Sequence, residues 1–158
     1  MTPMRRKDRE MDEAFALSLL ANCAYATLSM SDGAGNPYAV PVSPVMEDRT
    51  VYIHCAVAGK KLELLARCPR VCLSCVGRTK VLEADYSMAY ESAIALGVAT
   101  LVEDAEERRH ALRLICEKYA PTAMGGFDAY LAGQFAHTAV IRVDITSISG
   151  KCNNRFDG

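Results

Sequence analysis

The sequence has 158 residues, of which 51% are hydrophobic and 23% charged, and this indicates a folded protein with one domain across residues 1–158. A formal net charge of −1 argues against a broad basic face, so we expect no nucleic-acid partner. No apolar run is long enough to cross a bilayer, and residues 1–10 form a charged lead-in without a signal-peptide core. We therefore expect a cytoplasmic protein with no membrane contact.

The sequence has seven cysteines, an odd number, which predicts reduced thiols that pack as small apolar side chains. Cys72 and Cys75 form a CxxC motif with Cys68 nearby. On a strand, residues three apart face opposite sides of the sheet. No second CxxC follows, and only three histidines are present, so we expect no metal site.

The first half of the chain begins with a predicted helix over residues 11–22 and a strand over residues 25–30. A dense turn signal at residues 31–37 predicts a hairpin, with a return strand over residues 38–46. Pro41 and Pro44 interrupt that strand, because proline cannot donate to a ladder. Two interpretations remain open here: a segment that leaves backbone groups free for a ligand, and a protected edge strand.

The next strand, residues 51–55, leads into a helix over residues 60–67. Alternation places Tyr52 and His54 on one face of the strand, away from Cys55. Lys60 and Lys61 lie in the first helical turn, where the macrodipole favours acids over cations. A bound anion, held by the lysines and the free amides of the helix start, would resolve this conflict. Two solvated lysines without a partner are the alternative.

The second half of the chain contains three more predicted strands, over residues 71–76, 90–103 and 138–149, with a turn at residues 77–80. In the middle strand Ser92 shares a face with large apolar residues, whereas the other face is small. That small face suits either a flat ligand or a packed helix.

Two helices are predicted between the last two strands, over residues 104–119 and 124–133. Asp104 caps the first of them. Strands dominate without regular βαβ units, so the fold class is mainly β with short helices. An antiparallel barrel is favoured over a Rossmann-type sheet.

One group of side chains suits a phosphorylated, planar, partly apolar ligand. Lys60, Lys61 and Ser92 supply cations and a hydroxyl donor, and His54 and Tyr52 share a face. The segment Val40-Pro41-Val42-Ser43 supplies backbone groups beside an apolar slot.

Five segments in this order resemble the FMN-binding split-barrel superfamily of pyridoxamine 5'-phosphate oxidase-related proteins, and most of all its nitroimidazole-resistance (Nim) branch. They are Met4-Arg-Arg-Lys-Asp-Arg-Glu10, Gly35-Asn-Pro-Tyr-Ala-Val-Pro-Val-Ser43, Val51-Tyr-Ile-His-Cys-Ala56 with Gly59-Lys-Lys61, Tyr90-Glu-Ser-Ala-Ile-Ala-Leu-Gly97 and Ile145-Thr-Ser-Ile-Ser-Gly-Lys151.

The resemblance implies a six-stranded antiparallel split barrel of Greek-key type, forming a homodimer with FMN at the subunit interface. It implies that the backbone of Val40, Pro41, Val42 and Ser43 faces the flavin ring. Lys60, Lys61 and Ser92 would hold the phosphate, Tyr52 would lie in the cofactor site, and His54 would be the catalytic residue. The implied function is reduction or oxidation of a small molecule, with NADH, NADPH or another reductant reloading the flavin. The alternative is a non-catalytic flavin- or haem-binding protein of the same fold.

The sequence departs from this family in two respects. The arginine–histidine set of a true pyridoxamine 5'-phosphate oxidase is missing, so that activity is not expected. The chain has no tryptophan to pack on the flavin, which leaves Tyr38, Tyr52 and Tyr90 as candidates.

Overall fold

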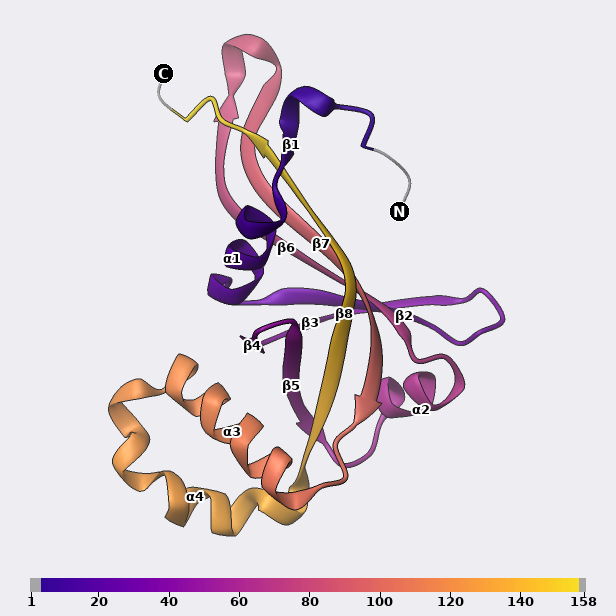
Figure 1. Cartoon of the computed structure of the whole chain (residues 1–158), viewed down its shortest axis with the longest axis vertical. Coiled ribbons are helices and arrows are strands. Elements are labelled where there is room, and N and C mark those ends of the chain that lie inside the picture. The colour runs from indigo at the N-terminus through magenta and orange to yellow at the C-terminus, as the bar shows by residue number, and fades with distance from the viewer. Residues whose placement is uncertain (1–3, 157–158) are drawn as a thin grey trace.

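The structure is a computed structural model, and it describes residues 4–156 (Figure 1). Its strands are β1 (Glu10–Met11), β2 (Ala26–Ser31), β3 (Pro37–Val42), β4 (Pro44–Glu47), β5 (Thr50–Ala56), β6 (Arg70–Leu82), β7 (Ser87–Leu101) and β8 (Thr138–Asn153). Its α-helices are α1 (Glu13–Asn22), α2 (Lys60–Arg67), α3 (Ala105–Tyr119) and α4 (Phe127–Gln134). No helix within the described range is long and apolar enough to span a membrane.

The strands form one antiparallel sheet in the order β3-β2-β6-β7-β8-β5-β4, and β1 pairs with β8 beside this path. The two end strands, β3 and β4, are adjacent in the chain and are joined through Ser43. The sheet therefore curls until its ends meet at this residue, without closing. The predicted mainly β split barrel with short helices is confirmed.

The structure has eight strands instead of the predicted six, and both differences have a local cause. Residues 38–46, predicted as one strand, divide at Ser43 into β3 and β4, because prolines flank that point. The second difference is β1, a strand of only Glu10 and Met11 that pairs with Gly150 and Lys151 of β8. Two residues are too few to show a strand periodicity, so the sequence does not predict it.

The main core lies inside the curled sheet, where the inward residues of β2, β5, β6, β7 and β8 meet. Helix α1 packs on this inner face and contributes Ala16 and Leu20, which are 0% and 2% exposed. The small face of β7 also points inward, and Ala93 lies opposite Gly150, which α1 covers. Of the two interpretations of the small face, the structure supports helix packing.

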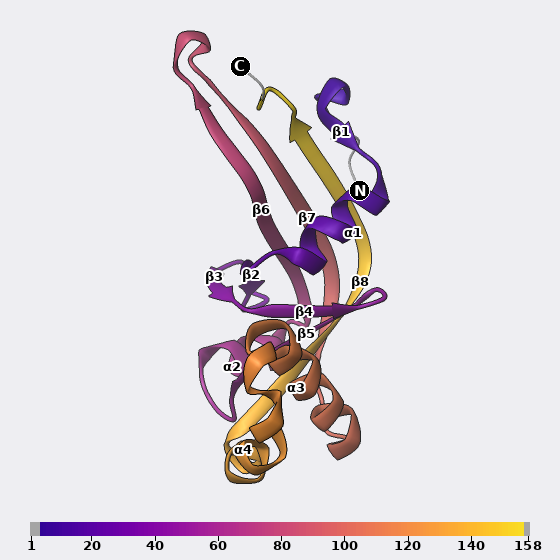
Figure 2. The same ribbon diagram turned by 90° about the vertical axis from the view of Figure 1, so that its left-hand side faces the viewer.

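A second apolar cluster lies on the outer face of β5 and β8, where α3 and α4 pack (Figures 1 and 2). Ala111, Leu112 and Ile115 of α3 meet Val140 of β8. Asp104 caps α3 as predicted, because its carboxylate accepts a hydrogen bond from the amide of Glu107 at 2.8 Å. The outward-facing Tyr52 of β5 therefore packs against these helices.

The hairpin of β6 and β7 is longer than predicted and extends beyond the barrel (Figure 1). The predicted turn at residues 77–80 is wrong, because pairing resumes at Thr79 and continues to Leu82 opposite Ser87. A register shift between Val76 and Thr79 interrupts the ladder at the predicted turn. Such a bulge bends the strand and redirects its side chains.

Candidate functional site

The start of α2 combines an uncapped helix N-terminus with two lysines. Gly59 precedes it with φ of 137°, a left-handed conformation that glycine adopts without steric cost. It offers no side-chain cap, whereas aspartates cap α1 and α3. The amides of the first turn are thus left without a side-chain acceptor, next to Lys60 and Lys61. This environment suits a phosphate.

A cavity of about 180 Å³ opens beside these lysines. Tyr38 and Val40 of β3 form one wall, and Cys55 of β5 forms another. The ammonium of Lys60 lies 5.9 Å from the centre of the Tyr38 ring, within the range of a cation–π contact. The cavity therefore joins cations and free amides to an apolar wall.

Three of the predicted cofactor residues, Val40, Lys60 and Lys61, line this cavity together. The other three residues of the β3 segment do not line it. Pro41 is exposed, Val42 is buried, and Ser43 is half-buried at the junction of the two strands. Strand β3 pairs only with β2, so its second edge has no partner strand within the described chain. That free edge is what the prolines predicted.

His54 lies on the opposite face of β5 from Cys55, paired with Val140 of β8. The residue is exposed in part, but the protein around it keeps water from one side of the ring. This desolvation lowers the pKa of the His54 imidazole, and the positive charge of Lys61 lowers it further. At neutral pH the ring is accordingly neutral. His54 is therefore near the lysine pair without lining the cavity beside it.

We expect Lys61→Gln to raise the pKa of His54, because it removes a positive charge that disfavours the imidazolium. An NMR titration of the His54 ring measures this, with Lys60→Gln as the matched control. The lowered pKa also makes stability depend on pH. Because the folded protein binds the His54 proton more weakly than the unfolded chain, whose histidine pKa is about 6.5, the free energy of unfolding is higher above that pH and falls on acidification. An unchanged or lower His54 pKa in Lys61→Gln would contradict the contact.

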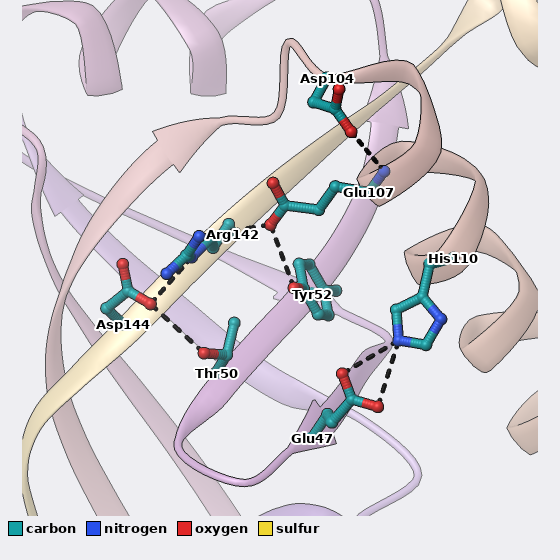
Figure 3. Close-up of polar contacts among 8 residues, drawn as sticks. All are labelled: Glu47, Thr50, Tyr52, Asp104, Glu107, His110, Arg142 and Asp144. Atoms are coloured by element: carbon teal, nitrogen blue, oxygen red, sulfur yellow. Dashed lines mark hydrogen bonds and ion pairs between the residues drawn. The ribbon is translucent and has the colours of Figure 1, made fainter.

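The Tyr52 side chain packs against α3 and does not line the cavity (Figure 3). Its side chain is buried in the second cluster, and its hydroxyl donates to Glu107 Oε1 at 3.1 Å. Burial, followed by this carboxylate, raises the pKa of Tyr52 to about 12. The guanidinium of Arg142 forms an ion pair with the same Glu107 carboxylate at 3.4 Å and a second one with Asp144 at 2.9 Å. This network ties β5 and β8 to the helix start, at a distance from the lysine pair.

Ser92 and the lysine pair lie far apart within one chain. Helix α2 ends just before Arg70, which pairs with Val98 of β7. Ser92 is six residues further along β7, roughly 20 Å at the rise of an extended strand. Ser92 accordingly does not line the cavity beside Lys60 and Lys61.

Six of the nine residues lining the cavity were not assigned to it from the sequence, and Tyr38 and Cys55 are the two with a polar or reactive group. Tyr38 was one of three tyrosine candidates for an aromatic wall, and it is the one that lines the cavity. Alternation assigns Cys55 to the face of β5 opposite His54. Which residues that face contacts depends on how the sheet curls, and the sequence does not predict this. Burial raises the pKa of the Cys55 thiol, although Lys61 lowers it, so the thiol stays protonated at neutral pH. This argues against a nucleophilic role.

The two cysteines of the CxxC motif face opposite sides of the sheet, as predicted. Cys75 is 2% exposed in the core opposite Ala93, whereas Cys72 lies half-buried on the outer face opposite Leu96. Between residues 4 and 156, no group of three or more His, Cys, Asp or Glu side chains is arranged to hold a metal ion.

Comparison with known proteins gives a family match over most of the chain. The family described as pyridoxamine 5'-phosphate oxidase matches residues 12–152. No curated protein matches the chain.

Similar solved structures include a candidate 5-nitroimidazole antibiotic resistance protein from Bacteroides thetaiotaomicron. It is 27% identical with a TM-score of 0.71, covering 90% of this chain and 85% of that one. The flavocytochrome Anf3 from Azotobacter vinelandii is 22% identical with a TM-score of 0.77, covering 96% and 72%. An FAD- and haem-binding protein from Mycobacterium smegmatis is 20% identical with a TM-score of 0.76, covering 92% and 74%.

Proposed function

Because the chain belongs to the pyridoxamine 5'-phosphate oxidase family, we propose that it is an FMN-binding oxidoreductase that reduces or oxidises a small molecule. The observation that carries the proposal is the uncapped start of α2, where Lys60 and Lys61 meet a cavity with a Tyr38 wall. These residues would bind the phosphate and the adjoining chain of FMN. The similar structure from the nitroimidazole-resistance group supports a nitroaromatic compound as one class of acceptor.

FMN is preferred to FAD because the lysine pair forms a compact site for one phosphate. A cavity of about 180 Å³ accommodates a phosphate and part of the attached chain, and among the described residues Lys60 and Lys61 are its only cationic lining side chains. Several similar structures are named for FAD, so the flavin itself has to be identified. Chromatography of the flavin released by heat from the purified protein distinguishes the two cofactors.

The flavin ring would extend from this cavity along the free edge of β3. The backbone of Val40, Pro41, Val42 and Ser43 would face it, and Pro41 has no N–H to donate. When bound, FMN supplies the electron transfer, and the protein binds, orients and tunes it. The chain itself contributes an ordered edge, an apolar wall and a phosphate anchor.

A homodimer would complete the site. The outer face of β7 exposes Ile94, Leu96 and Val98, which are 45%, 39% and 38% exposed in one contiguous row. Such a row is typical of a surface that a partner covers. Ser92 continues the same row, and it does not line the cavity beside the lysines of its own chain. In a dimer, Ser92 would contact the phosphate in the other subunit's site.

His54 would act on the substrate side of the flavin, as a neutral imidazole that donates or accepts a hydrogen bond. We expect His54→Ala to keep near-normal FMN content, because the side chain does not line the phosphate cavity. We expect its turnover to fall by about 10²-fold or more if the ring moves a proton in the reaction. Stopped-flow reduction by NADH or NADPH, followed by reoxidation with a nitroaromatic acceptor, measures this loss.

His110→Ala is the matched control, because His110 lies on α3, where its ring forms hydrogen bonds with the Glu47 carboxylate. It should leave both flavin content and turnover unchanged. Loss of FMN in His54→Ala with normal turnover per bound flavin would make His54 a cofactor-binding residue instead. Bound flavin that no reductant bleaches, or a Soret band, would favour the non-catalytic flavin- or haem-binding alternative.

A further inference from the structure

A second cavity, of about 630 Å³, lies at the other end of the β6–β7 hairpin from α2. Its lining includes four arginines from three separate parts of the chain: Arg6, Arg9, Arg78 and Arg155. The protein as a whole carries a formal net charge of −1, so this gathering of guanidinium groups is local. The cavity shares no lining residue with the one beside Lys60 and Lys61.

The fold brings these arginines together through three features that the flavin site does not use. Strand β1 pairs with β8 at Gly150 and Lys151, which places the charged N-terminal segment along the sheet. The register shift at Val76 and Thr79 lets Arg78 leave the regular alternation of β6. The chain then passes from β8 to Arg155 on the same side.

Three of the guanidinium groups are held in position by a carboxylate. Arg6 contacts Asp8 at 2.5 Å and Arg155 contacts Asp85 at 3.2 Å. Arg78 binds Glu91 with two nitrogens, at 3.0 and 2.7 Å. A guanidinium has five N–H donors, and a carboxylate engages about two of them, so the ion pairs of Arg6 and Arg155 leave donors for a ligand. Asp8 and Asp85 thus orient these two arginines and leave part of each guanidinium for a ligand.

Arg9 and two apolar side chains complete the cavity wall. The guanidinium of Arg9 lies 5.9 Å from the centre of the Tyr90 ring and 4.0 Å from the Asp8 carboxylate. Met11 and Phe15, at the start of α1, supply apolar surface. The cavity volume falls within the range typical of small-molecule sites. A lining that combines four guanidinium groups with two apolar side chains suits a compact anion with more than one acidic group.

We propose that this cavity is a binding site for a small organic anion that carries two oxyanion groups, phosphate or carboxylate. Planar guanidinium groups bind both oxyanions with paired hydrogen bonds, which makes this the shared chemistry of the site. The carboxylates of Asp8 and Glu91 in the same wall disfavour an extended polyanion, because its further charges would meet them.

The test is isothermal titration of the purified protein, loaded with FMN, against pyrophosphate and separately against succinate. We expect saturable 1:1 binding of at least one, and the two arms distinguish a phosphate site from a dicarboxylate site. The double variant Arg9→Gln/Arg155→Gln should bind at least about tenfold more weakly, because it removes two charged donors. Arg155 forms an exposed ion pair and half-buried Arg9 only a 4.0 Å contact with Asp8, and such pairs contribute little to folding, so the variant should remain folded.

Arg113→Gln is the matched control, because Arg113 forms a comparable exposed pair with Asp128 at 3.4 Å on α3. It should bind the probe normally. Repeating the titration with Lys60→Ala/Lys61→Ala separates this site from the proposed phosphate anchor, and binding there should persist. Absence of binding for both probes, equal weakening in both arginine variants, or loss of binding with the lysines would each overturn the proposal.

Discussion

The double variant Lys60→Ala/Lys61→Ala is expected to purify with almost no bound flavin. Hydrogen bonds to charged groups contribute about 1.5–3 kcal/mol each, so removing both lysines should weaken FMN binding by more than 100-fold. The fold should survive, because Lys60 is exposed, Lys61 is half-buried and alanine favours the helix. The molar ratio of flavin to protein, from absorbance after extraction, measures the loss.

Arg67→Ala is the matched control for this variant, since Arg67 is an exposed cation in the last turn of the same helix. It should keep a full complement of flavin, and a urea unfolding curve should show both proteins folded. A lysine double variant that retains one FMN per subunit would remove the phosphate anchor from this account.

Replacement of Gly97 by alanine is expected to have the largest effect on stability. Gly97 lies on the inner face of β7, where the register to β8 shifts between Leu96 and Gly97. An added Cβ would lie 2.7 Å from the carbonyl oxygen of Asp144 and 2.7 Å from a methyl of Val143. Backbone cannot move aside as a flexible side chain can, so we expect a loss of about 1–3 kcal/mol in unfolding free energy.

Gly133→Ala provides the control for this prediction. Gly133 lies in α4 with no atom within 4 Å of an added Cβ, so alanine there should stabilise the helix slightly. Chemical denaturation of both variants compares them directly. Equal stabilities for Gly97→Ala and the unmodified protein would show that the two strands can separate at this point without cost.

The sequence predicts the fold best where local patterns decide the structure. Asp104 predicts the start of α3 because its capping bond is local. Pro41 and Pro44 predict an interrupted strand, although not that the two halves would become opposite ends of one sheet path. The β6–β7 hairpin is underestimated because Arg78, Thr79 and Lys80 are polar, and backbone pairing there needs no apolar alternation.

The candidate site divides in the same way. Lys60 and Lys61 stand out from the sequence because they conflict with the helix dipole, a local effect. For Tyr52, period-two alternation gives the face but not its neighbour. Glu107 arrives from α3, 55 residues further along the chain. For Ser92 too, alternation gives the face but not the contact, because its proposed partner is in another subunit.

The absorption spectrum of the protein as purified tests the central claim most directly. The account predicts a yellow protein with the two visible bands of an oxidised flavin, at about one FMN per subunit. It also predicts that NADH, NADPH or a chemical reductant bleaches these bands. A colourless protein that stays colourless after incubation with excess FMN and removal of the unbound cofactor would contradict it.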